Sequence, residues 1–181
     1  MFVASLYRRS DPFRERIEAA AHVLHAGDFD SESALADTRH YASKLTAVSG
    51  NMDPRIGLPA VATVELGGVE FVLTHGTGPT RGYEQRVATT VREEASTDDA
   101  VGIAGHTHEL LDTRSEGTRL LILVAINSWK YSPPRGWPNF QFLIATSINP
   151  GSVTGASPAT RAMMMTATVA DGSLDVETHE L

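Results

Sequence analysis

Five short polar fragments, each beside an apolar run, constrain the fold of this chain more than any other feature. They are Gly27-Asp28-Phe29-Asp30, Gly50-Asn51-Met52-Asp53, Thr74-His75-Gly76, Gly105-His106-Thr107-His108 and Asn149-Pro150-Gly151-Ser152. The runs before the first four are short, rich in β-branched residues and end at a glycine or a polar residue, which is typical of buried strands and their exits. Ligand sites in α/β sheets gather outside the carboxyl ends of strands, so we expect these fragments to meet in one crevice.

The side chains in these fragments suit metal ions. Asp, Asn and His are hard or borderline ligands, and together they fit two divalent cations that bind water and phosphate. His106 and His108 stand two positions apart, so their side chains point to the same side of an extended backbone. Taken alone, Asp28 or Asn51 after a glycine is better interpreted as a turn residue that tolerates positive φ. The ordered series, and not any one fragment, favours a metal centre.

Composition narrows the class of protein. The 181 residues are 41% hydrophobic and 20% charged, which is enough for one folded domain with a sizeable core. The absence of cysteine excludes disulfides, thiolate zinc sites and cysteine nucleophiles. A net charge of -7, with no basic cluster beyond Arg8-Arg9, argues against specific nucleic-acid binding. The start of the chain lacks the pattern of a signal peptide, and no apolar run could span a bilayer, so we expect a cytoplasmic protein without a membrane partner.

The order of elements predicts the fold class. Helical patterns begin at Pro12, at Ser31 and at Tyr83, with short apolar strands between them. After Gly105 the chain turns strand-rich, at about residues 109–114, 119–124, 162–169 and 174–178, and the Met residues at 163–165 are expected in the core. This pattern predicts an α/β (α+β) fold in which helices flank a two-sheet β-sandwich.

The fragments resemble the motifs of the calcineurin-like metallophosphoesterase superfamily, in its small YfcE-type and archaeal phosphodiesterase branch. The GDxxD-like, GNxD, HG, GHTH and NPGS motifs of that family stand at Gly27, Gly50, His75, Gly105 and Asn149. The resemblance implies a sandwich fold and a metallophosphoesterase that hydrolyses a small phosphodiester substrate with a water activated by two divalent ions. Manganese is the expected metal, and Ni2+, Co2+ and Mg2+ are alternatives.

The resemblance also implies a ligand set. Asp28 would bridge both metals, and Asn51, His75 and His106 would complete the second metal site. His108 would belong to the first site. Of these, Asp28, Asn51 and His75 are the expected catalytic residues.

Other motif residues would support the centre. Asp53 would hold a ligand histidine from behind, and His25 would pack nearby. Asn149 and Ser152 would close the floor of the site. Met52 stands where many relatives with broad monoesterase activity carry a histidine that protonates the leaving group. Because a thioether cannot donate a proton, Met52 favours phosphate diesters with good leaving groups.

One family motif is absent. Family members open with an apolar strand that ends in Asp-x-His and supplies two ligands to the first metal, whereas here Phe2-Val3-Ala4-Ser5-Leu6 leads to Tyr7-Arg8-Arg9. The first site would keep only Asp28 and His108. We therefore expect one tightly bound metal, a second one bound weakly, and poor hydrolysis that an Asp-x-His strand grafted before Ser10 would improve. A gene that lost the strand, or a start site farther upstream, would explain the absence.

This loss leaves a second class of function open. A relative in the eukaryotic retromer complex has the same fold and acts as an assembly subunit, and such an interaction or scaffold subunit would tolerate the loss of ligands. The presence of Asn51, His75, His106 and His108 favours the enzyme.

The stretch of residues 122–147 departs from the family pattern and would be an insertion within a single domain of residues 1–181. It contains Trp129 and Trp137, and prolines break its middle. We expect a hairpin-like excursion or irregular lobe at the rim of the site, which the core could lose and still fold. Aromatic residues gather at interfaces, so a self-association surface and a homo-oligomer are one interpretation of this lobe.

Overall fold

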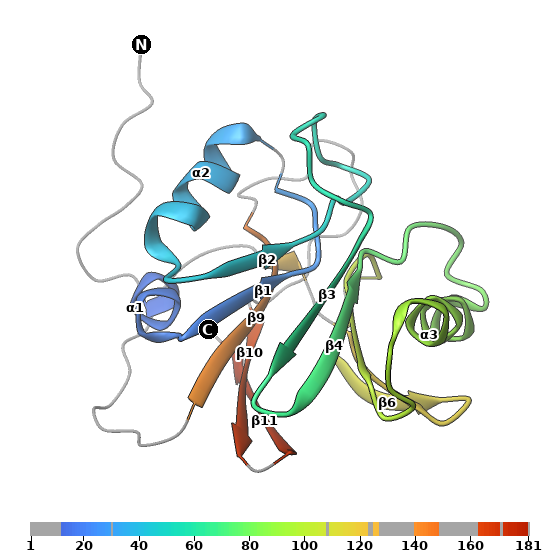
Figure 1. Cartoon of the computed structure of the whole chain (residues 1–181). Helices are drawn as coiled ribbons and strands as arrows, with labels where there is room; N and C mark the ends of the chain where they lie inside the picture. Colours follow the sequence, from blue (N-terminus) through green and yellow to red (C-terminus); the bar gives the residue numbers. More distant parts are fainter. Residues whose placement is uncertain are drawn as a thin grey trace.

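The computed structural model describes residues 12–29, 31–107, 109–122, 125–126, 140–148, 163–170 and 172–180 (Figure 1). The helices in this part of the chain are α1 (Pro12–Ala19), α2 (Glu32–Tyr41) and α3 (Tyr83–Glu94). The strands are β1 (His22–His25), β2 (Leu45–Ala47), β3 (Val61–Leu66), β4 (Val69–Thr74), β5 (Val101–Ala104), β6 (Leu111–Ser115), β7 (Thr118–Ile122), β8 (Ala125–Ile126), β9 (Phe140–Ile148), β10 (Met163–Ala170) and β11 (Ser173–Glu180). None of the helices in these ranges has the length and apolar composition needed to cross a bilayer.

The strands form two sheets. The first has the order β11-β10-β9-β1-β2, with β8 paired to β9, and the second has the order β3-β4-β5-β7-β6. β1 runs parallel to both β2 and β9, and β4, β5 and β7 run parallel to one another. Because parallel strands end at the same edge, the loops that follow β1 and β2 are neighbours, and so are those that follow β4 and β5.

The two sheets pack on each other through one apolar core. Leu24 of β1 and Met165 of β10 belong to the same buried cluster as Phe71 and Leu73 of β4 and Ile103 of β5. Each of these side chains is almost fully excluded from solvent. Burying one such side chain contributes about 1.5–3 kcal/mol, so this layer is the main stabilising contact between the sheets.

Helices cover the outer faces of both sheets (Figure 1). Val87 and Val91 of α3 lie four residues apart, on one face of the helix, and pack against Leu120 of the second sheet. Ile17 of α1 and Leu35 of α2 belong to two clusters on the first sheet. The result is a helix–sheet–sheet–helix arrangement.

The sequence predicted most of these elements correctly. The expected helices correspond to α1, α2 and α3, and Ser31 caps α2 by accepting a hydrogen bond from the N–H of Ala34. The mixed α/β class is confirmed, with Met164 and Met165 in the core. β3 was not predicted, although its alternating apolar residues lead into the two-glycine turn at Gly67-Gly68.

The expected lobe at residues 122–147 differs from what the structure shows. β9 lies between β1 and β10 in the middle of the first sheet, so the strand from Phe140 onward is part of the core architecture. A deletion through residue 147 would remove most of this strand, and we no longer expect the rest of the chain to fold without it. Residues 123–124 and 127–139, which include both tryptophans, lie outside the described residues, as does the chain before Pro12.

The contact between α3 and the second sheet depends on Gly102 of β5. A Cβ atom at this position would lie 2.6 Å from Cγ2 of Val91 and 2.7 Å from Cδ2 of Leu120. We predict that Gly102→Ala lowers the free energy of unfolding by about 1–3 kcal/mol because the added methyl overpacks this layer. Urea unfolding would measure the change. The double variant Gly102→Ala/Val91→Ala should lose less unfolding free energy than the sum of the losses in the two single variants. Strict additivity would contradict this account of the contact.

Candidate metal centre

Four loops bring their polar residues to one place. The loops that follow β1 and β2 carry Asp28 and Asn51, and the loops that follow β4 and β5 carry His75 and His106. Each sheet therefore contributes two side chains to the site. Hydrogen-bond distances between these side chains show that the structure brings together all four of these sequence-predicted residues.

The loops after β1 and β2 pack directly on each other through two glycines. A Cβ atom on Gly27 would lie 2.6 Å from the backbone nitrogen of Gly50, and one on Gly50 would lie 2.1 Å from Oδ1 of Asp28. No other residue type has room at either position. The approach explains why a glycine precedes both Asp28 and Asn51 in the sequence.

Two candidate ligands have a backbone conformation that is rare for residues with side chains. Asp28 has φ 62° and His106 has φ 69°, and in the described chain the only other non-glycine residue with positive φ is Glu116, in the β6–β7 turn. Such a conformation costs about 1 kcal/mol or more and is found where the surrounding structure imposes it, often at functional sites.

The ring of His75 is oriented by the backbone behind it. His75 is buried, and its Nδ1 lies 2.7 Å from the carbonyl oxygen of Ala26. Because a carbonyl oxygen only accepts, Nδ1 carries the hydrogen and donates it. The other ring nitrogen, Nε2, faces the site at 2.9 Å from Oδ1 of Asn51 and 3.3 Å from Oδ2 of Asp28.

The ring of His106 is held in the same way. Its Nε2 lies 2.9 Å from the carbonyl oxygen of Gly78, to which it donates, and its Nδ1 lies 2.8 Å from Oδ1 of Asn51. The ring packs edge to face on His75, with 5.2 Å between centroids, and Tyr83 lies 6.4 Å away and nearly parallel to it.

These contacts bring four lone-pair donors close together when both imidazoles are neutral. The donors are Oδ2 of Asp28, Oδ1 of Asn51, Nε2 of His75 and Nδ1 of His106. Such atoms repel one another unless a proton or a cation lies among them. The mixture of carboxylate, amide and imidazole fits a divalent transition metal.

The amide of Asn51 is essential to this donor set. Among the described residues, no group of three or more His, Cys, Asp and Glu side chains has by itself the arrangement that holds a metal ion. The candidate donor set forms only when the amide oxygen of Asn51 is counted, because this oxygen lies between the rings of His75 and His106.

The electrostatics of Asp28 and His75 are coupled. Burial alone would raise the pKa of the Asp28 carboxyl, but hydrogen bonds from His75 and from the N–H of Met52, with the nearby imidazoles, outweigh it and lower the pKa. Burial alone would lower the pKa of His75, but its contact with Asp28 outweighs that effect and raises it. A proton on Nε2 of His75 therefore occupies the position that a cation would take.

Two carboxylates link the loops after β1 and β2 in opposite directions. Oδ1 of Asp28 accepts a hydrogen bond from the N–H of Met52 at 2.9 Å. In return, Asp53 accepts one from the N–H of Phe29 through Oδ1 and one from the N–H of Gly50 through Oδ2, the latter at 2.7 Å. Asp53 was expected to hold a ligand histidine, whereas its hydrogen bonds go to the backbone of both loops.

His25 lies beneath this pair of loops. Its Nδ1 accepts a hydrogen bond from the N–H of Gly27 at 3.3 Å, and its ring stacks on Phe29 with 3.7 Å between centroids. Burial lowers the pKa of His25 to about 3, so this imidazole is neutral at physiological pH. Its position agrees with the expected packing role. His108, Asn149 and Ser152 lie outside the described residues.

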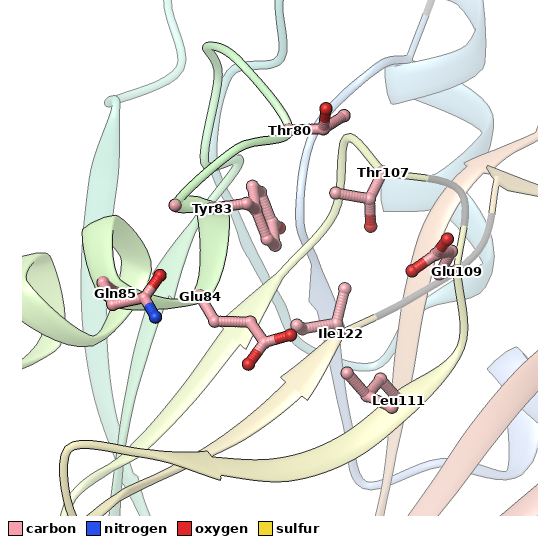
Figure 2. A pocket seen from close by; sticks show the side chains of 9 residues that line it. Thr80, Tyr83, Glu84, Gln85, Thr107, Glu109, Leu111 and Ile122 are labelled. Atoms are coloured by element: carbon pink, nitrogen blue, oxygen red, sulfur yellow. The ribbon is translucent and has the colours of Figure 1, made fainter.

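A cavity of about 210 Å³ lies next to the loop after β5, with Thr107 of that loop in its lining (Figure 2). Tyr83, whose ring lies near that of His106, forms part of its wall, and the carboxylates of Glu84 and Glu109 reach into it from opposite sides (Figure 2). Sequence reasoning missed these lining residues because they come from α3, β6, β7 and two loops, and no local motif joins them.

Known proteins with the same fold include both phosphoesterases and sorting proteins. Over 99% of this chain and 95% of the other, a single mutant of Vps29 from Entamoeba histolytica matches with a TM-score of 0.57 and 21% identity. A predicted phosphoesterase from Streptococcus pneumoniae matches with a TM-score of 0.59 and 21% identity, over 93% and 79% of the two chains. A novel archaeal phosphodiesterase matches with a TM-score of 0.55 and 18% identity, over 92% and 90%. No curated protein matches the sequence.

These likenesses show the fold, and a family match shows the relationship. Residues 7–172 match the calcineurin-like phosphoesterase superfamily domain, and this range includes the glycine-flanked loops that carry Asp28, Asn51, His75 and His106. The family predicted from the sequence motifs is thereby confirmed. The chain belongs to the calcineurin-like phosphoesterase superfamily.

Proposed function

We propose that this protein is a metal-dependent phosphodiesterase. The observation that carries the proposal is the convergence of Asp28, Asn51, His75 and His106, with both histidine rings fixed by backbone carbonyl groups. Rings fixed in this way lose little freedom when they bind a metal, so the site is prepared for one.

The proposed ligands divide the work between them. Asp28 would contribute the negative charge, and the neutral donors Asn51, His75 and His106 would leave a bound cation with net positive charge available for a phosphate. Divalent ions in such a site polarise phosphate oxygens and make water a better nucleophile at neutral pH. We propose Mn2+ as the metal, with Ni2+, Co2+ and Mg2+ as alternatives. A structure of Vps29 from Entamoeba histolytica is described as complexed with Zn2+.

Two features favour a diester over a monoester. Met52 is 52% exposed beside Asn51 and cannot protonate a leaving group. In addition, Glu84 and Glu109 place negative charge in the cavity lined by Tyr83 and Thr107. A monoester carries close to two negative charges at neutral pH and a diester one, so these carboxylates disfavour the monoester more strongly.

The first metal site is the weaker part of the proposed centre. Only Asp28 and His108 of its expected ligands occur in the sequence, since the Asp-x-His motif is absent. We propose one tightly bound metal and slow turnover, with both improved by an Asp-x-His strand grafted before Ser10.

A scaffold role is the alternative function. The likeness to Vps29 structures and the missing motif favour it. An interaction subunit would need the sheets and helices but not the donor geometry of His75 and His106. Hydrolysis that depends on added metal therefore discriminates between the two proposals.

The first test is hydrolysis of a bis-aryl phosphodiester with added Mn2+. We expect activity that a chelator abolishes and that Asp28→Asn lowers by at least about 100-fold, beyond the 10- to 100-fold typical of a residue that only supports a ligand. Asp37→Asn on α2 makes the same chemical change away from the site and should retain full activity. Equal activity in wild type and Asp28→Asn would exclude the proposed site.

The second test uses competition between protons and metal. The pKa of His75 is raised by its contact with Asp28, against the effect of burial, and the protonated ring cannot bind a metal. Saturating Mn2+ should therefore raise the thermal unfolding midpoint more at about pH 8 than at about pH 5.5. Each value is taken relative to a chelator control at the same pH. A shift of the same size at both pH values would contradict metal binding through His75.

The third test concerns leaving-group chemistry. Met52 donates its backbone N–H to Asp28, so a change of its side chain preserves that hydrogen bond. We predict that Met52→His raises the hydrolysis of alkyl phosphomonoesters, relative to aryl diesters, by at least about tenfold, since general acid catalysis contributes about 10²–10⁴-fold. Met52→Leu is the matched control and should leave the ratio unchanged. If both variants shift the ratio equally, proton donation is not the cause.

A further inference from the structure

The carboxylates of Asp28 and Asp53 accept hydrogen bonds from each other's loops, and these bonds set the relative position of two proposed ligands. Asp28 follows β1 and Asn51 follows β2, so these ligands lie on separate loops. Asp28 accepts from the N–H of Met52 in the second loop, and Asp53 accepts from the N–H of Phe29 in the first. Each loop thus supplies one carboxylate and one backbone donor to the other.

Asp53 also fixes its own loop. Its second oxygen accepts from the N–H of Gly50, the residue immediately before Asn51. Its two hydrogen bonds therefore act on the residue after Asp28 and the residue before Asn51. Asp53 has no hydrogen bond to any of the four proposed ligand side chains in the described structure.

We propose that Asp53 is a positioning residue that holds the Asp28 and Asn51 loops in metal-binding register through their backbones. The inference rests on the proposed function, since it assumes that Asp28 and Asn51 bind a metal. The positive φ of Asp28 makes the role necessary, because a strained backbone relaxes unless its neighbours hold it. The contact between Gly27 and Gly50 limits how closely the loops approach, and Asp53 prevents them from separating.

The test separates this role from simple charge and from general stability. Asp53→Asn keeps the shape of the side chain but loses its charge and one acceptor. Asp53→Glu keeps the charge but moves the carboxylate by one methylene, which spoils the reach to both N–H groups. Because outer residues that orient ligands typically affect metal affinity 10- to 100-fold, we expect both variants to weaken Mn2+ binding by about that factor in calorimetric titration.

Glu70 offers a matched control at the other end of β4 from His75. Its carboxylate also holds two backbone N–H groups, those of Ser96 and Thr97, at 2.9–3.1 Å. Glu70→Gln should lower the thermal midpoint of the metal-free protein to a similar extent as Asp53→Asn but keep the wild-type Mn2+ affinity within about twofold. The visible spectrum of bound Co2+ should change in both Asp53 variants and remain unchanged in Glu70→Gln.

If Asp53→Glu keeps the wild-type affinity for Mn2+ and only Asp53→Asn loses it, Asp53 acts through its charge. That result would overturn the inference. Loss of affinity in Glu70→Gln equal to that in the Asp53 variants would show that affinity merely follows stability, and would overturn it as well. A wild type that binds Mn2+ but hydrolyses no diester would refute the proposed function and leave the inference standing. A wild type that binds neither Mn2+ nor Co2+ would refute both.

Discussion

The contact between Gly27 and Gly50 is the constraint on which the rest of the site depends. Neither residue has a side chain, so the loops after β1 and β2 approach closely. A Cβ atom on Gly50 would lie only 2.1 Å from Oδ1 of Asp28. This approach brings the N–H of Met52 within reach of Asp28 and the N–H of Phe29 within reach of Asp53. It also leaves Asp28 in a left-handed backbone conformation with its second oxygen toward His75.

The sequence was most informative about strands whose local pattern of apolar residues matches their buried position in the fold. Short apolar runs next to glycine predicted β1, β2, β4 and β5, because a buried parallel strand must be apolar throughout and must end in a turn. The same runs predicted that Asp28, Asn51, His75 and His106 would meet. The family resemblance supplied the assignment of roles, which the residues alone would not have given.

The sequence was less informative about long-range pairing. The break from family spacing at residue 122 suggested that the next 25 or so residues are peripheral, yet β9 from Phe140 onward pairs with β1 from the beginning of the chain. His22 at the start of β1 is likewise buried and hydrogen-bonded to Thr46 of β2, a partner that its own sequence neighbours do not indicate. The role of Asp53 could not be read either, because its partners are backbone groups and these have no signature in the residue types.

The site also has a mechanical consequence for the sandwich. Asp28 and Asn51 belong to the first sheet, and His75 and His106 belong to the second. The apolar layer between the sheets resists separation but has little directional preference, so on its own it allows the sheets to slide slightly on each other. An ion ligated from both sheets would resist this sliding, because the sliding would stretch directional metal–ligand bonds. The rigidity of the whole molecule against shear would then depend on a few atoms at one edge.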